Sequence, residues 1–348
     1  MIKSVLIANR GEIAIRIART ARRMGIKTYV VRTAKEPEAV YLSAADAVID
    51  FPETDGNIPE FLDIDRLVGL TREYKIDSLH PGYGYLSENA ELAERCRDNG
   101  IVFIGPSPEV IRLMGDKVAA KGIAAQSGVP MLGASQGAVH TLDEARGIAK
   151  RLGYPVIIKA VSGGGGRGMR IVHHQDELEQ LYKIATAEAQ VAFNDPSVFI
   201  EKYLENPKHI EFQIVADNYG NVVHLGEREC SIQRKHQKLM EEAPSPALDE
   251  RLRKKMAAAA VSLAKQAGYQ SLGTVEFLLD HQKHFYFMEM NTRIQVEHPV
   301  TEEITGIDLV ELQFNIAAGR KLPLRQSQIH LNGWSIECRI NAEDVQAG

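Results

Sequence analysis

The stretch that decides the fold is PVIIKAVSGGGGRGMRIV, residues 155–172, in which two short apolar runs flank a glycine-rich turn. Five of the seven residues from Ser162 to Gly168 are glycine. Glycine loses more conformational entropy on ordering than any other residue, so a plain hairpin would not need so many. The glycines do allow backbone N–H groups to approach a charged ligand closely, and phosphate is the common one. We therefore expect two strands, 156–160 and 169–172, that carry a phosphate-binding flap.

The flap is not a Walker-type loop, because no Gly-Lys-Ser/Thr sequence closes it and a strand follows instead of a helix. Lys159, at the end of the first apolar run, could simply extend its ammonium group into solvent. Beside a phosphate loop we expect it to neutralise phosphate oxygens instead. A flexible linker without a ligand is the alternative interpretation of the same glycines.

Upstream, the first hundred residues alternate short apolar runs with helical patterns. The runs predict strands at 5–8, 28–31, 78–80 and 101–104, and the helical spacing predicts helices at 12–24, 64–74 and 91–99. Such alternation indicates α/β architecture with a parallel, doubly wound sheet. A dinucleotide site is the obvious function for such a sheet, but Gly11 alone occupies the first turn and no G-x-G-x-x-G follows. Further helices are expected at 109–127, 142–152, 176–192 and 249–268.

Downstream, two strand-like runs joined by a four-residue loop end at Asp280 and resume at Phe285. If these two residues pair, Glu276 falls directly opposite Glu289. Like charges in that position are destabilising unless a cation lies between them or one is protonated. With Asn291 on the same face, the pattern predicts an oxygen-ligand site for a cation such as magnesium. The alternative is an edge hairpin whose glutamates lie in water.

Polar side chains continue at the odd-numbered positions Arg293, Gln295 and Glu297, while Ile294 and Val296 are apolar. An extended segment would present a guanidinium, an amide and a carboxylate in one row with the metal ligands. That row suits a small planar anion held beside a base. An ordinary amphipathic strand would show the same alternation.

Composition excludes several classes of protein. The 348 residues contain 41 Lys and Arg against 46 Asp and Glu, a net charge of −5, so the chain lacks the basic footprint of a nucleic-acid or anionic-membrane binder. The densest basic run, 233–238, lacks stacking aromatics, which leaves a solvated face or a local anion site. The three cysteines are far apart and form no zinc-type pair. With no signal-peptide core or membrane-length apolar run, we expect a cytoplasmic protein, or an organellar one without its transit peptide.

Together these motifs resemble the biotin carboxylase family of the ATP-grasp superfamily. The resemblance covers essentially the whole chain. It is carried by IANRGEIA at 7–14, HPGYGYLSEN at 80–89, the glycine loop, EKYL at 201–204, the run 233–238, EMNTRIQVEHPVTE at 289–302 and ECRINAED at 337–344. The resemblance implies a Rossmann-like N-terminal domain over 1–114 and an ATP-grasp domain over 115–320 with a mobile glycine-rich lid at about 131–203. It also implies the start of a C-terminal domain over 321–348, which we expect to be incomplete because the family continues beyond its last motif.

The resemblance also assigns ligands to residues of this sequence. ATP would contact Lys117, Lys159, Gly163, Gly164, Gly165, Gly166, Met169, Glu201, Lys202, Leu204, His209, Gln233, His236 and Leu278. Mg²⁺ or Mn²⁺ would bind Glu276, Glu289 and Asn291. Bicarbonate and biotin would contact Lys238, Arg293, Gln295, Val296, Glu297, Arg339 and Tyr83, with Glu297 as general base and Arg339 stabilising the biotin enolate. Lys238 and Arg293 complete the catalytic set.

The implied activity is an ATP-dependent ligase that carboxylates biotin N1′ through carboxyphosphate, the first half-reaction of an acyl-CoA carboxylase or a pyruvate-type carboxylase. No Met-Lys-Met attachment motif occurs, so biotin is expected on a separate biotin carboxyl carrier protein or domain, with a carboxyltransferase as second partner. A homodimer is expected where the C-terminal part is present. The alternatives are another ATP-grasp ligase, of the carbamoyl-phosphate or purine-synthesis type, and a catalytically silent nucleotide-binding fragment.

Overall fold

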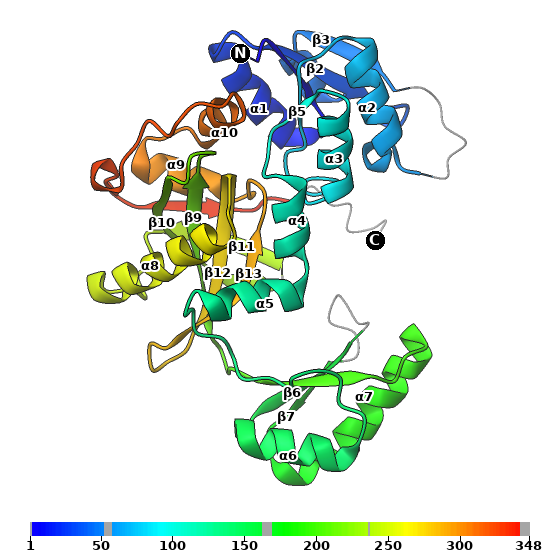
Figure 1. Cartoon of the computed structure of the whole chain (residues 1–348), viewed down its shortest axis with the longest axis vertical. Coiled ribbons are helices and arrows are strands. Elements are labelled where there is room, and N and C mark those ends of the chain that lie inside the picture. Colours follow the sequence, from blue (N-terminus) through cyan, green and yellow to red (C-terminus); the bar gives the residue numbers. More distant parts are fainter. Residues whose placement is uncertain (1, 52–57, 162–168, 236, 342–348) are drawn as a thin grey trace. The chain divides into compact units, whose positions relative to one another are not determined.

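A computed structural model describes residues 2–51, 58–161, 169–235 and 237–341 of the chain. The chain forms two compact units (Figure 1). The first comprises Met1–Val129, Lys208–Leu279 and Phe287–Gly348, and the second comprises Pro130–Pro207 and Asp280–Tyr286. The second unit contains the segment that the sequence analysis assigns to a lid. Among the described residues, no helix combines the length and the apolar character needed to span a bilayer.

The first unit begins with a five-stranded parallel sheet in the order β3-β2-β1-β4-β5. Its strands are β1 (Ser4–Ile7), β2 (Lys27–Arg32), β3 (Ala47–Asp50), β4 (Ser78–His80) and β5 (Val102–Phe103), and its helices are α1 (Gly11–Arg23), α2 (Ile64–Glu73) and α3 (Ala90–Asp98). The α/β prediction of a parallel, doubly wound sheet is confirmed. Strand β3 was not predicted, because its apolar run Ala47-Val48-Ile49 is only three residues long and this edge strand buries only Ile49.

The helix predicted over 109–127 is two helices, α4 (Pro108–Gly115) and α5 (Lys117–Gln126). Asp116 separates them because its backbone is extended, with φ −83° and ψ 114°. Its carboxylate accepts hydrogen bonds from the N–H groups of Val118 and Ala119 at 2.8 and 2.9 Å, which caps α5. The break places Lys117 in the first turn of α5, where its side chain is exposed.

The first unit also holds a six-stranded sheet in the order β13-β12-β9-β10-β11-β14. Its strands are β9 (Lys208–Ala216), β10 (Val222–Arg234), β11 (Gln237–Ala243), β12 (Ser271–Leu279), β13 (Phe285–Asn291) and β14 (Ser335–Cys338). Helix α8 (Glu250–Gln266) packs on β9 and β10, and α9 (His298–Thr305) packs on β10, β11 and β14. Arg253 of α8 donates to Glu227 of β10, and Thr301 of α9 accepts from Arg228, the next residue of β10. Successive side chains of a strand point to opposite faces, so the two helices cover opposite faces of the sheet.

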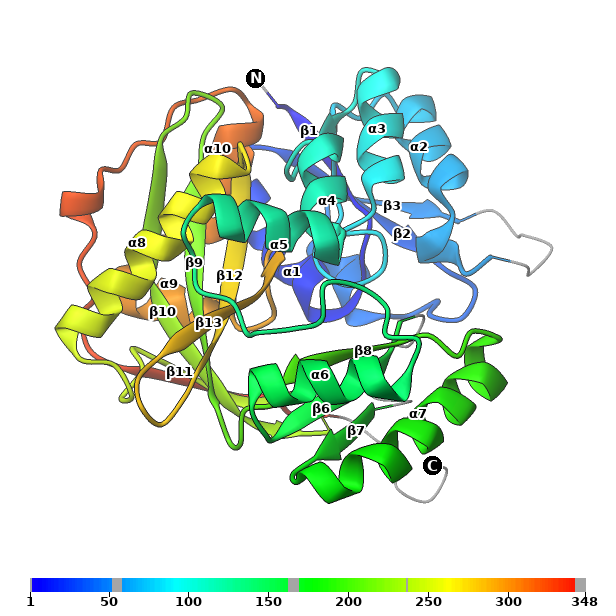
Figure 2. The same cartoon turned by 60° about the horizontal axis from the view of Figure 1, so that its bottom comes forward.

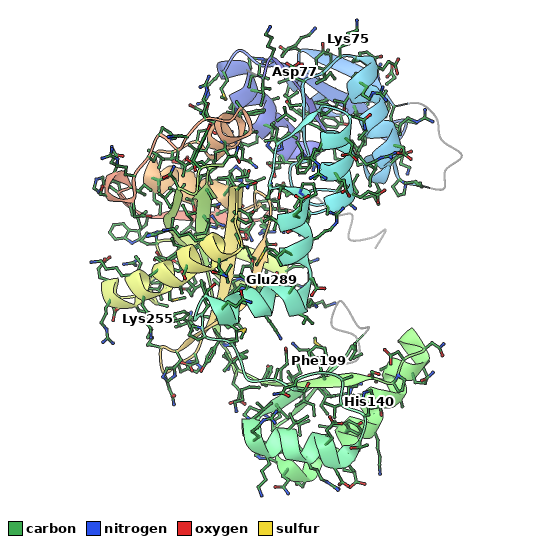
Figure 3. The ribbon with its side chains drawn as sticks, in the orientation of Figure 1. Lys75, Asp77, His140, Phe199, Lys255 and Glu289 are labelled. Atoms are coloured by element: carbon green, nitrogen blue, oxygen red, sulfur yellow. The ribbon has the colours of Figure 1, made fainter. Side chains whose placement is uncertain are left out.

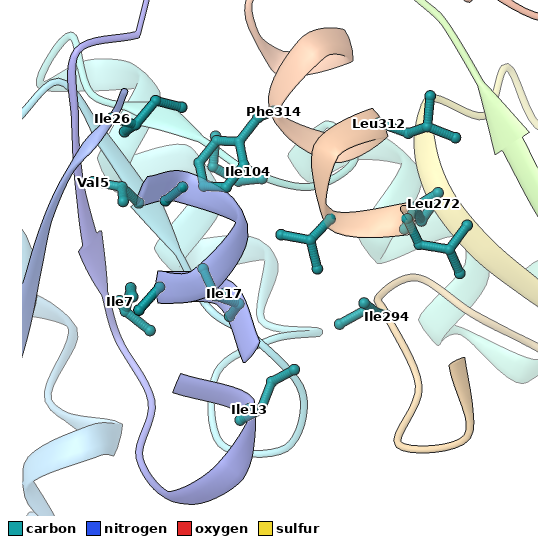
Figure 4. Close-up of a cluster of buried hydrophobic side chains, with 14 of the residues drawn as sticks. Val5, Ile7, Ile13, Ile17, Ile26, Ile104, Leu272, Ile294, Leu312 and Phe314 are labelled. Atoms are coloured by element: carbon teal, nitrogen blue, oxygen red, sulfur yellow. The ribbon is translucent and has the colours of Figure 1, made fainter. Parts of the chain in front are cut away.

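Helix α10 (Leu309–Ala317) joins the two sheets of the first unit through a shared core. Its buried side chains Leu312 and Phe314 belong to the same cluster as Ile17 of α1 and Leu272 of β12 (Figure 4). Ile294, from the segment after β13, is also buried in this cluster. Burial of these side chains therefore fixes that segment against the body of the unit.

The second unit is a three-stranded antiparallel sheet in the order β7-β6-β8, with two helices packed on it (Figure 2). The elements are α6 (Leu142–Leu152), β6 (Val156–Ala160), β7 (Met169–Val172), α7 (Leu178–Phe193) and β8 (Val198–Lys202). Both strands predicted beside the glycine loop are confirmed. Short 3-10 helices lie at Val40–Ala44, Glu60–Leu62, Gln175–Glu177 and Gln326–Gln328.

Candidate functional site

One face of the six-stranded sheet carries a buried row of charged side chains. Glu276 on β12 is opposite Glu211 on β9, and Glu211 is opposite Arg228 on β10. Side chains of directly paired residues point to the same face of a sheet, so the three form one row. Each is at most 3% exposed. Burial of charges at this depth is tolerated only with partners, and the partners define the site.

Lys238 on β11 is the ammonium that joins three carboxylates. Its Nζ lies 2.6 Å from Glu211 Oε2, 3.1 Å from Glu276 Oε1 and 2.7 Å from Glu297 Oε1. Burial alone would lower the pKa of Lys238, but the three carboxylates outweigh it and raise the pKa. Burial alone would likewise raise the pKa of Glu276, and His209 and Lys238 instead hold it well below its usual range. Lys238 is therefore a permanent cation and Glu276 a permanent anion at neutral pH.

Arg339 holds the other oxygen of Glu297. Its Nη2 donates to Glu297 Oε2 at 2.9 Å, while its Nε donates to Glu241 Oε1 at 2.7 Å. Glu297 is thus clamped between a guanidinium and an ammonium with its side chain buried. Beside it, burial and the negative charges of Glu241 and Glu297 raise the pKa of Glu337 to about 7. Glu297 therefore lies between two cations, Lys238 and Arg339, and close to a carboxyl group, Glu337, that can exchange a proton near neutral pH.

The segment after β13 departs from the predicted extended row. The strand ends at Asn291, the chain bends, and Glu297 begins α9 with φ −76° and ψ 11°, which is not extended. The row prediction is wrong because Ile294 turns into the shared core and helix α9 starts within the motif. The bend still brings Gln295 to the cluster, where its Nε2 donates to Glu276 Oε1 at 2.7 Å.

Arg293 is half-buried and is held from two sides. Its Nη2 donates to Asn291 Oδ1 at 2.9 Å, and its Nε donates to Glu88 Oε2 at 3.1 Å. The other oxygen of Glu88 accepts the N–H of Thr292 at 3.0 Å. Val296, the remaining residue assigned to bicarbonate, is half-buried in the turn between Gln295 and α9.

The predicted metal ligands lie around Glu276. Asn291 Nδ2 donates to Glu276 Oε1 at 2.7 Å. Glu289, labelled in Figure 3, lies on β13 with an exposed side chain. Partial desolvation and the negative charges of Glu276 and Glu88 raise the pKa of Glu289. A carboxylate beside a second one, with an amide oxygen adjacent, fits a hard divalent cation.

The turn that carries these ligands differs from the predicted one. Asp280 N–H donates to the carbonyl of His284 at 2.9 Å, and Lys283 N–H donates to the carbonyl of Asp280 at 3.1 Å. The predicted pairing of Asp280 with Phe285 is therefore wrong by one residue. Lys283 takes a positive φ of 65°, which shortens the loop to close on His284. Asn291, two residues beyond Glu289 on the same strand, nevertheless reaches Glu276 Oε1 through its Nδ2 at 2.7 Å.

Residues assigned to the nucleotide lie in both units. In the first unit, His209 Nε2 lies 2.7 Å from Glu276 Oε2, and Gln233 Nε2 lies 3.1 Å from His209 Nδ1. Although burial opposes protonation, the Glu276 carboxylate raises the pKa of His209. Leu278 is opposite His209 in the sheet. His209 therefore contacts the carboxylate row directly, and Gln233 is linked to the row through His209.

In the second unit, Lys159 Nζ forms an ion pair of 2.6 Å with Glu201 Oε2, across the β6–β8 pair. Lys202 Nζ donates to the carbonyls of Gly153 and Tyr154 at 3.0 and 2.9 Å, which is a structural role for its ammonium. Met169 begins β7, and Leu204 follows β8, half-buried. The predictions for Gly163, Gly164, Gly165, Gly166 and His236 fall outside the described residues.

Tyr83 and Lys117, both predicted from the first unit, are not joined to the Lys238 cluster by the hydrogen bonds found in the described part of the chain. Tyr83 donates its hydroxyl proton to Glu12, and its carbonyl accepts Asn9 Nδ2 at 2.7 Å. The same Asn9 explains Gly82, since a Cβ there would lie 2.8 Å from Asn9 Nδ2. Lys117 is exposed at the start of α5.

Sequence reasoning missed four residues that build the site: Glu211, Arg228, Glu241 and Glu88. A signal for the first was present, because strand 208–216 alternates polar His209, Glu211 and Gln213 with apolar neighbours. Arg228 and Glu241 show no comparable local pattern, since their partners come from other strands and from α9.

Comparisons with known proteins agree with this architecture. Residues 1–111 match the family described as biotin carboxylase, N-terminal domain, and residues 116–325 match the carbamoyl-phosphate synthase L chain, ATP binding domain. The chain is 54% identical over 340 residues to a biotin carboxylase of Nostoc, covering 98% of the chain and 76% of that protein. It is 49% identical to biotin carboxylase 1 of Bacillus subtilis, covering 99% of the chain and 76% of that protein.

Solved structures show the same similarity. The biotin carboxylase–beta-gamma-ATP complex from Campylobacter jejuni superimposes with a TM-score of 0.90 at 48% identity, covering 99% of this chain and 77% of that one. The biotin carboxylase domain dimer of the 2-oxoglutarate carboxylase from Hydrogenobacter thermophilus, in complex with MgADP, ADP and bicarbonate, gives 0.88 at 49% identity, covering 100% and 76%. The fold and site define an ATP-dependent ligase of the ATP-grasp type. Within that class, the chain belongs to the biotin carboxylase family.

Proposed function

We propose that this chain carboxylates biotin N1′ with ATP and bicarbonate, through carboxyphosphate. The observation that carries the proposal is the Glu297 carboxylate clamped by Lys238 at 2.7 Å and by Arg339 at 2.9 Å. The two cations hold both oxygens of this buried carboxylate in place and supply positive charge for a small anion whose proton it can accept. The neighbouring Gln295 amide and Arg293 guanidinium supply donors for the same small planar anion.

The reaction that we propose uses these side chains in turn. Lys238, Arg293, Gln295 and Val296 hold bicarbonate, and Glu297 accepts its proton. A bicarbonate oxygen then attacks the γ-phosphorus of ATP, and the bond to ADP breaks, which gives carboxyphosphate. Carboxyphosphate breaks down to CO₂ and phosphate, and the phosphate takes the proton from biotin N1′. Arg339 stabilises the resulting enolate while N1′ attacks CO₂.

Nucleotide and metal contacts complete the proposal. We assign Lys117, Lys159 and the glycine flap to the phosphates, and assign His209, Gln233, Leu278 and the segment 201–204 to the rest of ATP. The cation would be held by Glu276, Glu289 and Asn291, and when bound it supplies positive charge to the phosphate oxygens. The matched donor set and the mutual repulsion at Glu289 support this assignment.

The partners that we propose are a biotin carboxyl carrier and a carboxyltransferase, with a dimer of the kind named for the Hydrogenobacter domain. The same region is 47% identical to human mitochondrial pyruvate carboxylase, of which it covers 29%. Biotin would be contacted by Arg339 and Tyr83. We further propose a reducing compartment such as the cytoplasm, a mitochondrion or a plastid. The three free cysteines, two of them buried, support that placement.

The test is bicarbonate-dependent ATP cleavage with and without free biotin. We expect cleavage that requires bicarbonate and rises with biotin. An ATP-grasp ligase for an amine acceptor would respond to that amine and not to biotin, and a silent fragment would bind nucleotide without cleaving it. Glu297→Gln should nearly abolish cleavage while ADP still binds. Wild-type turnover in that variant would remove Glu297 from the mechanism.

A further inference from the structure

Arg228 is the largest wholly buried side chain in the first unit, and the proposed mechanism does not use it. Its side chain is 0% exposed, so it cannot touch a substrate that enters from solvent. A buried guanidinium is expensive unless all of its N–H groups are bonded. The identity of its partners therefore indicates what the residue is for.

All five N–H donors of Arg228 find acceptors. Nε donates to Glu211 Oε1 at 2.6 Å. Nη1 donates to Gln213 Oε1 at 2.8 Å and to Thr301 Oγ1 at 2.9 Å. Nη2 donates to Thr274 Oγ1 at 3.2 Å and to Gln295 Oε1 at 2.6 Å. These acceptors come from β9, β12, α9 and the segment before α9, so one side chain ties the sheet to the motif that carries the proposed base.

The contact with Gln295 fixes which way its amide points. A guanidinium has donors and no acceptor, so Gln295 must offer Arg228 its oxygen. Its NH₂ group is then directed to the opposite side, where it donates to Glu276 Oε1 at 2.7 Å. Without Arg228 the amide keeps only its contact with Glu276, so its orientation is less firmly held. Arg228 and the Glu276 carboxylate thus fix the amide from its two ends, so that Gln295 directs its NH₂ group toward the carboxylate cluster.

The contact with Glu211 has a parallel effect. Arg228 engages Oε1 of Glu211, which leaves Oε2 for Lys238 Nζ at 2.6 Å. Although burial raises the pKa of Glu211, the charges of Lys238 and Arg228 outweigh it and hold the carboxylate ionised. The ammonium of Lys238 is therefore held by an oriented carboxylate.

We propose that Arg228 is a positioning residue that sets the donor direction of Gln295 and the orientation of Glu211, and so builds the bicarbonate subsite from behind. The inference rests on the proposed function, which supplies bicarbonate as the anion. It predicts that loss of Arg228 weakens bicarbonate binding and changes nucleotide binding little. None of the five hydrogen bonds described above joins Arg228 to a residue assigned to ATP.

The test compares Arg228→Lys with Arg253→Lys. Lysine keeps the positive charge of Arg228, but its ammonium group lacks the planar arrangement of donors that lets a guanidinium bond Gln295 and Glu211 at the same time. Arg253 is the matched control, since it forms a two-oxygen ion pair with Glu227 at 2.8 and 3.0 Å on the opposite face of the same sheet. In Arg228→Lys we expect the KM for bicarbonate to rise about tenfold, while the KM for ATP stays within about twofold.

The control should leave both constants within about twofold of wild type. An unchanged bicarbonate KM in Arg228→Lys would overturn the proposal, as would an equal rise in both constants. If Arg228→Lys does not fold, Thr301→Val removes one acceptor of the fork without changing charge. A rise in bicarbonate KM alone then supports the proposal, and no rise overturns it.

A thermal unfolding cycle keeps this inference separate from the proposed function. Should the wild-type chain fail to cleave ATP with bicarbonate, the proposed function fails, yet Arg228 can still be tested. Arg228→Lys, Gln295→Met and the double variant are melted in parallel. A double variant that loses less Tm than the sum of the two single variants supports the positioning contact, whereas additive losses overturn it.

Discussion

Replacing Lys238 by Met leaves three buried carboxylates without their common cation. The lysine side chain is 14% exposed, and those of Glu211, Glu276 and Glu297 are 0%, 4% and 3% exposed. Removing one partner from a buried ion pair costs about 3–5 kcal/mol because a charge is left uncompensated. We therefore expect Lys238→Met to lose about 3–5 kcal/mol of unfolding free energy near pH 8, together with all bicarbonate-dependent turnover.

The pH dependence of that loss is the sharper part of the prediction. In the wild type the folded pKa of Glu276 is lowered, so its stabilisation is present above the unfolded pKa and is lost as pH falls. Without Lys238 the three carboxylates repel each other, and at least one acquires a raised pKa. Such a group stabilises the folded state at low pH and loses that contribution as pH rises. The difference in unfolding free energy between wild type and variant should therefore grow as pH rises, by up to about 1.4 kcal/mol per pH unit for each proton.

The assay is urea unfolding at several values between about pH 5.5 and about pH 8.5, with Lys208→Met as control. Lys208 also forms an ion pair, 3.0 Å from Glu229, but its side chain is 52% exposed. The control should lose at most about 1 kcal/mol at every pH. If Lys238→Met behaves like the control, or if its loss does not change with pH, the reasoning about the cluster is wrong.

Three further predictions concern His80, a buried residue of β4, and two residues of the site, Glu88 and Glu289. Burial lowers the pKa of His80 to about 3, so the folded chain keeps it neutral and loses stability as pH falls below about 6.5. Between about pH 6.5 and about pH 5, wild type should lose about 1.5 kcal/mol more unfolding free energy than His80→Gln, and equal slopes in urea titrations would refute this. Glu88→Gln weakens the bond to Arg293 Nε, so steady-state kinetics should show the bicarbonate KM rising about fivefold at constant ATP KM; an unchanged bicarbonate KM would count against this orienting role. Glu289→Gln removes the repulsion of Glu276 and one oxygen charge, so magnesium titrations of activity should shift at least about tenfold to higher concentration; an unshifted titration would exclude Glu289 as a ligand.

The sequence predicts a strand or helix correctly where a local pattern of apolar and turn residues is enough to determine it. Runs such as 156–160, flanked by a glycine turn, predict their strands correctly because burial and turn chemistry are both local. The N-terminal sheet is predicted for the same reason. Asp116 breaks the helix over 109–127 through a single side-chain cap, which the apolar periodicity does not reveal.

The site itself was predictable only in part, because its geometry depends on tertiary contacts. Odd-numbered spacing identifies Gln295 and Glu297 as candidate ligands, yet the extended backbone assumed for them is overridden by burial of Ile294 in the shared core. Arg228 donates to Glu211, Thr301 and Gln295, which are distant from it in the sequence, so no local sequence pattern predicts its role. Hydrogen-bond partners supplied by distant strands become visible only when the sheet is assembled.

Transfer of heavy oxygen from labelled bicarbonate tests the central claim most directly. If a bicarbonate oxygen attacks the γ-phosphorus of ATP, that oxygen stays with phosphorus when CO₂ leaves. The purified chain, supplied with ATP, magnesium, free biotin and bicarbonate labelled in all of its oxygens, should release phosphate that carries one labelled oxygen atom. ATP cleavage that yields unlabelled phosphate would mean that water is the nucleophile, and would contradict carboxyphosphate formation at the Lys238–Glu297 site.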